Sequence, residues 1–557
     1  MDWAPASAIR WLFDSERGPT DRLIPRWLFL RALGLIYFSA FFSLLFQIRG
    51  LIGPKGILPA DAYLHAVARS LGHTRFWFAP TLLWFSGGSP MLTALCWVGM
   101  VASLLVAFNV WPRGMLLICL ACFLSFVSAA QDFSGYQSDG MLLEAGFIAL
   151  FLAPAGFLPG WGIPRAPSRA SLFLLQWEWF RIYFESGVAK IASGDPEWRH
   201  MTAMDEYYQN GPLPTWIGWY VQHLPHWFHA STTYATLALE LGLVWMLFLP
   251  RHLRIACFFI VTPWQIGIIL TANYTFLNYL VLALGVLLLD DRFLVHFLPR
   301  RWKRPFLDRA DARRTTDTSL TALDSDSKSR DVASQFSEGS RSEPERRCNW
   351  PALFRSQFAA LKLSVVAVML AWIFYATVAQ LVWIPLPTFP VTALEPFRIA
   401  NRYGLFAVMT RGRYEIEFQG SEDGQTWVAY PFRYKPQDSS KQPGIYAPYQ
   451  PRFDWNLWFA SLGSWREYPI VPNTEVRLLS NDPDVLALFA GNPFPHEPPR
   501  QVRAVLWQYW FTTMAEKRAQ RLWWRRQLLG LYAPTLQREP NGRIGIAQWP
   551  TVPAPRQ

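Results

Sequence analysis

Repeated apolar runs of about membrane length constrain the fold of this chain more than any other feature. Each run is near the roughly 20 residues that an α-helix needs to cross a bilayer. The 557 residues are 52% hydrophobic and include 29 Trp, which is typical of polytopic membrane proteins with aromatic belts. We therefore predict a polytopic α-helical membrane protein. About nine transmembrane helices are expected, at 27–48, 91–110, 114–130, 141–158, 171–191, 232–249, 255–271, 276–289 and 361–383.

The basic residues predict the orientation of these helices. The net charge is +12, but the arginines lie in short loops between apolar runs, so we expect a lipid bilayer and no nucleic acid as partner. Cytoplasmic loops are enriched in Lys and Arg. With a cytoplasmic N-terminus, an odd number of helices places everything after residue 384 outside the cytoplasm. The basic loops then all fall inside: Arg113, Arg165, Arg169, Arg251, Arg254 and the cluster at 300–304.

Changes in composition divide the chain into five parts. Residues 1–299 form the predicted transmembrane helical domain. The Ser-, Asp- and Arg-rich stretch 300–350 is predicted to be a disordered cytoplasmic linker. Residues 351–390 hold the last transmembrane helix, 391–515 an extracytoplasmic β-rich domain, and 516–557 a basic helix and tail.

The extracytoplasmic domain is predicted to be sandwich-like. Residues 413–434 alternate apolar and polar side chains on both sides of a Glu-Asp-Gly turn, which indicates a β-hairpin. A second strand is expected at 502–511, and 453–462 has the apolar spacing of a helix. Residues 516–532 are predicted to form a basic amphipathic helix. Contact with anionic lipid and a solvated, salt-bridged face are the two interpretations left open for that helix.

The span at 171–191 carries charges that a plain membrane anchor would lack. Glu178, Arg181 and Glu185 share one helix face, whereas Lys190 lies off that face. Ionisable groups in a bilayer normally pair inside a bundle or line a cavity. We expect an internal Arg181–Glu185 ion pair, with Lys190 extending to the membrane interface. The predicted intramembrane polar network also includes Glu144 and Glu240 from other spans.

No residue pattern indicates a metal site or a cofactor, and we expect neither. His223, His226 and His229 recur every third residue, but a proline interrupts the run, so hydrogen-bonded interfacial histidines are preferred over metal ligands. Asp139 and Glu144 are about 140° apart on a helix, so we expect them to have separate partners. The five Cys form no disulfide framework. No nucleophile elbow, P-loop or dinucleotide fingerprint is present.

The chain contains an ordered set of segments that includes LIGPKGILPA at 51–60, FRIANRYGLFAVMT at 397–410 and YQPRFDWNLWFASL at 449–462. This set resembles the lipase maturation factor family over nearly the whole chain, apart from the linker and about the last 40 residues. The residues at matching motif positions are Trp198, Arg199, Asp205, Asn210, Pro212, Asp454, Trp455, Trp458, Asn492 and Pro493.

This resemblance implies a membrane factor, rather than an enzyme, that helps exported client proteins such as secreted lipases to fold and assemble. Its membrane would be the endoplasmic reticulum in a eukaryote or the inner membrane in a bacterium. The C-terminal domain would face the extracytoplasmic side, in agreement with the charge pattern.

A second resemblance concerns only the segment around SGVAKI and EWRHMTAM, within 186–204. This segment is similar to vitamin K-dependent γ-carboxylases and related HTTM membrane domains, in which a lysine at the position matching Lys190 acts as a base. The alternative function is therefore a membrane enzyme acting on a lipid or quinone-like substrate. Glu185 and Asp195 oppose that role, because nearby carboxylates stabilise an ammonium.

Overall fold

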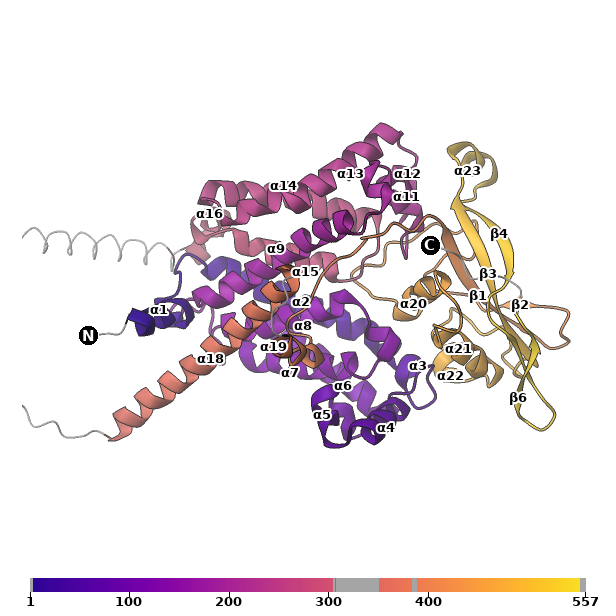
Figure 1. Ribbon diagram of the computed structural model, residues 1–557, viewed down its shortest axis with the longest axis horizontal. Helices are drawn as coiled ribbons and strands as arrows, with labels where there is room; N and C mark the ends of the chain where they lie inside the picture. The colour runs from indigo at the N-terminus through magenta and orange to yellow at the C-terminus, as the bar shows by residue number, and fades with distance from the viewer. Residues whose placement is uncertain (1–3, 304–305, 307–349, 383–387, 551–557) are drawn as a thin grey trace, which may run out of the picture.

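The computed structural model describes residues 4–303, 306, 350–382 and 388–550. A helical membrane domain carries the N-terminal helix α1 (Ala4–Phe13) at one end, and a sheet domain lies at the opposite end (Figure 1). Most of the predicted linker at 300–350 lies outside the described residues, and so does Cys348.

Each predicted apolar run falls on a helix of the membrane domain. In the described ranges, five helices are long and apolar enough to cross a membrane. Helices α7 (Pro112–Val127), α8 (Gln137–Leu152) and α15 (Leu277–Gly285) are shorter, and α9 (Arg169–Ala192) is long but charged. The chain is thus an integral membrane protein, and the number of crossings stays a prediction. The five are α2 (Leu23–Leu45), α6 (Ser89–Ala107), α13 with the turn η5 (His226–Phe248), α14 (Arg251–Thr271) and residues 357–381 of α18 (Trp350–Val382).

Short helices fill the connections between these long ones. They are α3 (Ile48–Ile52), α4 (Ala60–Leu71), α5 (Arg75–Phe78), α10 (Pro196–Arg199), α11 (Ala203–Asn210), α12 (Trp216–Gln222) and α16 (Asp291–Leu294).

Three arginines, of which Arg22 and Arg26 are buried, hold together the end of the membrane domain that is farthest from the sheet. At the start of α2, Arg26 donates to the carbonyl of Arg165 at 2.7 Å. At the start of α14, Arg251 forms an ion pair with Asp290 at 2.5 Å. A further guanidinium, that of Arg22, donates to the carbonyls of Leu287 and Leu289 in and just after the turn η6 (Val286–Leu288), which follows α15. The basic loops singled out in the sequence therefore gather at one end of the helices.

The sheet domain contains one six-stranded sheet in the order β2-β1-β3-β5-β6, with β4 also paired to β3. The predicted hairpin is confirmed, because Gln419 of β1 lies opposite Ala429 of β2. The predicted sandwich is wrong for the described residues. Helices α20 (Arg452–Ser461) and α21 (Ile470–Leu479) cover the apolar face where a second sheet would pack (Figure 1). The strands are β1 (Arg413–Ser421), β2 (Val428–Ala429), β3 (Gln501–Phe511), β4 (Trp524–Leu531), β5 (Thr535–Arg538) and β6 (Ile544–Gln548).

The predicted basic helix at 516–532 is also wrong in its second half. Helix α23 (Met514–Gln520) begins with a capping box between Thr513 and Glu516, and it ends at Arg521, whose φ is 60°. The chain then reverses, and β4 pairs antiparallel with β3 over seven positions that include Trp524 opposite Phe511. Burial of Trp524 against that strand outweighs the local helical pattern of the basic residues. Strands β5 and β6 occupy residues that were expected to be a tail.

Candidate functional site

Residues 401–410, which we call the strap, lead into the sheet domain and lie along the C-terminal half of α9. The backbone N–H of Tyr403 donates to the carboxylate of Glu185 at 2.6 Å. Farther along, the N–H of Met409 donates to Asp195, also at 2.6 Å. The polar residues of α9 thus pair with strap backbone. Other such contacts are Arg181 to the Asn401 carbonyl, Ser186 to that of Leu405, and Ser193 to that of Ala407.

Arg181 is the centre of the polar network on α9. Its guanidinium forms an ion pair with Glu144 of α8 and a longer one, of 3.7 Å, with Glu185. The predicted Arg181–Glu185 pair is therefore present, but Glu144 is the closer partner. Glu144 also accepts the backbone N–H of Asn401 at 2.8 Å. Glu178 is buried nearby, and neither of its oxygens has a hydrogen-bond partner among the described residues.

Lys190 lies in the interior, and not at the interface where we expected it. Its ammonium donates to both carboxylate oxygens of Glu240 at 2.9 Å and to the hydroxyl of Ser186 at 2.6 Å. The ring of Trp198 covers it at 5.1 Å. The side chain does not extend outward because Glu240 of α13 faces it inside the bundle. Because the Lys190 ammonium is paired with both oxygens of the Glu240 carboxylate, this pairing opposes a role for Lys190 as a base.

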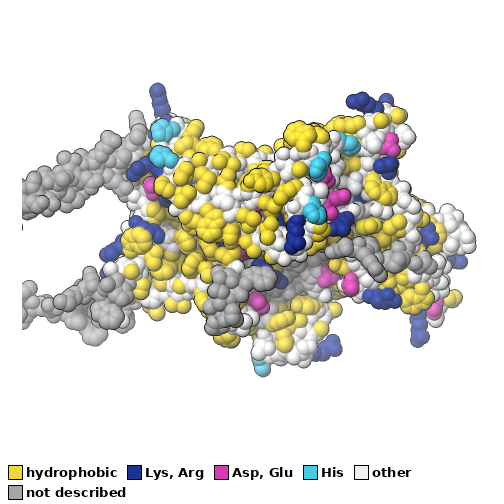
Figure 2. All heavy atoms as spheres, turned by 45° about the horizontal axis from the view of Figure 1, so that its top comes forward, with side chains coloured by type: hydrophobic (Ala, Val, Ile, Leu, Met, Phe, Trp, Pro, Cys, Tyr) yellow, Lys and Arg dark blue, Asp and Glu magenta, His cyan; other side chains and the backbone are white. Residues whose placement is uncertain are grey.

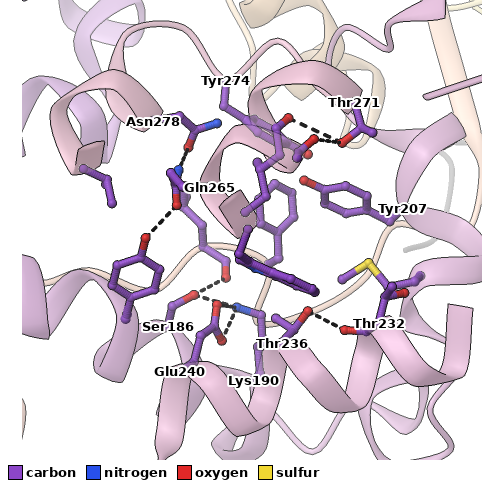
Figure 3. A pocket seen from close by; sticks show the side chains of 18 of the residues that line it. Ser186, Lys190, Tyr207, Thr232, Thr236, Glu240, Gln265, Thr271, Tyr274 and Asn278 are labelled. Atoms are coloured by element: carbon purple, nitrogen blue, oxygen red, sulfur yellow. Dashed lines mark hydrogen bonds and ion pairs between the residues drawn. The ribbon is translucent and has the colours of Figure 1, made fainter. Parts of the chain in front are cut away.

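The Lys190–Glu240 pair lines a cavity of about 540 Å³ enclosed by α9 to α15 and the strap. Figure 3 shows Lys190, Glu240, Ser186 and Thr236 along one side of it, with Tyr207 across from them. A volume between about 300 and 1,000 Å³ is typical of ligand sites. The rest of the lining is mainly apolar and aromatic. The cavity can therefore hold an amphiphilic molecule.

Half of the family-motif residues meet where the two domains join. The indole N–H of Trp198 donates to the strap carbonyl of Phe406 at 2.9 Å. Asn210 donates to the strap carbonyl of Thr410 at 2.8 Å, and its own carbonyl accepts the indole N–H of Trp458 at 3.1 Å. Residues from both halves of the motif set thus bind each other across the junction. Pro212 and Trp455 lie there too, contacting Arg413 and Tyr136 respectively.

The remaining motif residues have separate places. Asp205 contacts the Nδ1 atom of His226 at a hydrogen-bond distance of 2.9 Å. Arg199 is exposed at the end of α10. Asn492 accepts the N–H of Phe494 at 3.0 Å in a turn that also contains Pro493. The motif set therefore does not form one reactive centre.

The three histidines also have different partners. His223 contacts the carbonyl of Thr512 at 2.8 Å, His226 pairs with Asp205, and His229 is buried. Within the described ranges, no group of three or more His, Cys, Asp or Glu residues is arranged to hold a metal ion.

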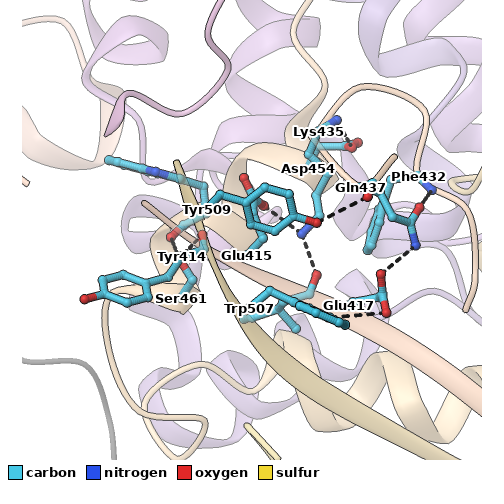
Figure 4. Close-up of polar contacts among 12 residues, drawn as sticks. Tyr414, Glu415, Glu417, Phe432, Lys435, Gln437, Asp454, Ser461, Trp507 and Tyr509 are labelled. Carbon is cyan, nitrogen blue, oxygen red and sulfur yellow. Dashed lines mark hydrogen bonds and ion pairs between the residues drawn. The ribbon is translucent and has the colours of Figure 1, made fainter. Parts of the chain in front are cut away.

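A second polar cluster lies between the sheet and α20, outside the membrane domain. Glu415 of β1 forms ion pairs with Arg413 and, at 2.9 Å, with Lys435. Asp454, one of the motif residues, accepts the backbone N–H of Lys435 at 3.1 Å (Figure 4). Burial raises the pKa of Asp454 to about 6. Because these groups are paired and buried, the cluster supports the fold of the sheet domain.

Two contacts that hold the junction together were not predicted from the sequence. Arg452 forms a two-pronged ion pair with Asp139, at 2.7 and 2.8 Å, between α20 and α8. The strap residue Asn401 was also missed. Two signals are visible in the sequence: Arg452 stands next to a helical motif, and Asp139 stands at the start of an apolar span. No local pattern links these two residues, because they lie far apart in the chain.

The described architecture defines a class: an integral membrane protein whose sheet domain is fastened to the membrane helices by a hydrogen-bonded strap. Two family models match the chain, the lipase maturation factor transmembrane domain at residues 24–296 and the lipase maturation factor C-terminal domain at 399–534. The chain therefore belongs to the lipase maturation factor family.

Curated relatives match over most of their length. Lipase maturation factor 2 of Rattus norvegicus is 32% identical over 92% of this chain and 83% of the relative. Lipase maturation factor 1 of Bos taurus is 30% identical over 95% of this chain and 91% of the relative. No solved structure matches the chain. The match extends over both domains, so the relatives cover the strap and the junction.

Proposed function

We infer that this protein is a membrane-bound maturation factor that assists the folding and assembly of exported proteins such as secreted lipases. Membership in the family across 92% of the chain carries this proposal. The motif residues support it, because half of them lie where the sheet domain meets the membrane domain and the set does not surround a reactive group. The alternative of an enzyme with Lys190 as base is not favoured, since that amine is paired with Glu240.

The proposed orientation places the sheet domain outside the cytoplasm. The three arginines and the basic loops described above gather at the end of the helices opposite the sheet. Because basic loops are retained on the cytoplasmic side, that end would be cytoplasmic. The membrane would be that of the endoplasmic reticulum in a eukaryotic host and the inner membrane in a bacterium. Client proteins would then meet the sheet domain in the compartment through which they are exported.

Deletion of this protein from its own host tests the function. The specific activity of a secreted lipase should fall while its synthesis, followed by pulse labelling, stays constant. An exported protein of another class serves as the control for general secretion. Unchanged activity for every secreted lipase of that host would contradict the proposal.

Reporter fusions test the orientation. A reporter active only outside the cytoplasm should work when it is fused after residue 390 and should fail when it is inserted within 305–345. Reporter activity from an insertion within 305–345 would contradict the proposed topology.

A further inference from the structure

The cavity beside α9 opens sideways, between two helices of membrane length. Helix α13 packs on α9, and α14 packs on α15, but α13 and α14 contact each other only sparsely. On α14, the cavity-lining Ile260 is 48% exposed, and Pro263 and Gly267 are exposed as well. Figure 2 shows mainly hydrophobic side chains on the face formed by these helices. The opening therefore faces the region that lipid tails occupy.

The charges in the cavity cancel. Among the described residues that line it, the charged ones are Lys190 and Glu240, and they form an ion pair with each other. An anionic headgroup would gain attraction from Lys190 but meet repulsion from Glu240 at nearly the same distance. A neutral headgroup with hydroxyl or ester groups can use the hydroxyls of Thr232, Thr236 and Tyr207 without that repulsion.

The volume and the lining of the cavity suit one hydrocarbon chain. Aliphatic and aromatic side chains of α9, α13, α14 and α15 make up most of its wall. Both charged groups lie on the Lys190 side, and the polar side chains of Gln265, Thr271, Tyr274 and Asn278 lie on the other sides of the cavity (Figure 3). The strap residue Leu405 lines the cavity and accepts a hydrogen bond from Ser186, whose hydroxyl also binds Lys190. A ligand in this place would therefore contact the strap that fastens the sheet domain.

From this geometry we propose that the cavity is a binding site for a neutral single-chain lipid, entered from the bilayer between α13 and α14. The headgroup lies at the Lys190–Glu240 pair, and the chain lies against the apolar wall. This site does not depend on the maturation role, since binding can be measured on the purified protein whether or not any client is known.

The test uses the full chain in nanodiscs and a photoreactive analogue of monooleoylglycerol. Labelling should saturate, and unlabelled monooleoylglycerol should compete for it far better than oleate or a two-chain phosphatidylcholine. Peptide mapping should place the label on α13, α14 or the strap. Labelling that does not saturate, or that maps elsewhere, would overturn the site. Stronger competition by oleate would overturn the neutral headgroup.

Gly267→Trp is the variant that blocks the opening. A side chain at Gly267 meets open space at its Cβ position, so this substitution should leave the fold intact. We expect a roughly tenfold or greater loss of specific labelling, equivalent to about 1.4 kcal/mol of binding free energy. Ile266→Trp is the matched control, because Ile266 is 43% exposed and is not among the described lining residues. Equal labelling of the two variants would show that the ligand does not enter this cavity.

Glu240→Gln tests the headgroup preference. Removing the anion leaves Lys190 unneutralised, so oleate should become a better competitor by roughly tenfold relative to monooleoylglycerol. The ratio of the two competitors is read on folded, monodisperse protein only. An unchanged ratio in folded protein would show that the headgroup does not lie at this pair. If the variant does not fold, the Gly267→Trp comparison still decides the proposal.

Discussion

The two halves of α9 use buried charge in different ways. Around Arg181, the carboxylates of Glu144 and Glu185 both pair with the guanidinium, and each also accepts a strap N–H group. Around Lys190, one ammonium faces one carboxylate at the wall of a cavity. The first arrangement fastens the sheet domain to the membrane domain, and the second leaves space for another molecule. A charged membrane helix can thus combine an anchor for an external domain with the edge of a binding site.

The largest effect is expected when the network around Arg181 loses its cation. Arg181→Leu leaves Glu144 and Glu185 without their common partner, and breaking a buried ion pair in this way costs about 3–5 kcal/mol. The thermal unfolding midpoint and the monodisperse yield in detergent should both fall sharply. Adding Glu144→Gln to the same chain should recover part of the loss. A variant as stable as the wild type would show that the network is not what holds the strap.

The buried carboxyl of Asp454 in the sheet domain provides a second test of buried charge, because it lies outside the membrane domain and the pH around it can be varied directly. Burial raises the pKa of Asp454 to about 6, from an ordinary value of 3.8. Between these two values the folded state binds more protons than the unfolded state, so stability should fall as the pH rises from about 4 to 6. Below about pH 4, where it is fully present, this contribution of Asp454 to the free energy of unfolding is about 3 kcal/mol.

Asp454→Asn should remove this part of the pH dependence. Unfolding midpoints of the full chain, measured between pH 4 and 7 with and without the substitution, give the difference. Glu422→Gln in the exposed hairpin turn is the control, because Glu422 is exposed. A wild-type curve that rises over this interval, with the same rise in the Asn variant, would contradict the assignment.

A smaller effect is expected at the cavity. Lys190→Met leaves Glu240 without its cation, but water or a headgroup can reach this carboxylate through the cavity, so we expect a cost of about 2 kcal/mol. The double substitution Lys190→Met with Glu240→Gln should be less damaging than the single one. Differential scanning measurements on the three chains check both statements. If Lys190→Met lost as much stability as Arg181→Leu, the two halves of α9 would not differ in the way proposed.

Much of this architecture could be predicted from local patterns, because hydropathy and strand alternation are local properties. The apolar runs, the hairpin at Gln419 and the helix containing Trp458 all appear as expected. The partners of the charges could not be predicted. Lys190 meets Glu240 at a separation of 50 residues, and Glu185 binds a backbone N–H 218 residues away. Backbone atoms carry no residue-type signal, so the strap cannot be recognised in one sequence.

The strand β4 shows the other limit. It lies in the segment 516–532, where Arg518, Arg521 and Arg525 have helical spacing, and the pairing with β3 makes an extended conformation favourable. The same dependence on tertiary context explains why the predicted sandwich became a single sheet with helices on it. A local pattern indicates that apolar residues will be covered, but it does not indicate by which element.

The smallest effect is expected at the far end of the strap. Asp195 begins α10, where it accepts the N–H of Glu197 at 3.2 Å, and it also accepts the N–H of Met409 at 2.6 Å. Asp195→Ala removes both hydrogen bonds at the margin of the membrane domain, where water can replace part of them. The expected cost is about 1 kcal/mol, typical for the loss of a helix cap.

Hydrogen exchange of strap amides distinguishes this local loosening from global unfolding. Exchange near Met409 should accelerate in Asp195→Ala, while exchange near Tyr403 should stay slow, because Glu185 still holds that end. Asp195→Asn keeps an acceptor oxygen and should retain most of the protection. If the whole strap exchanges quickly in Asp195→Ala, then its two ends are one cooperative unit, and the network around Arg181 cannot be the independent anchor that the comparison within α9 requires.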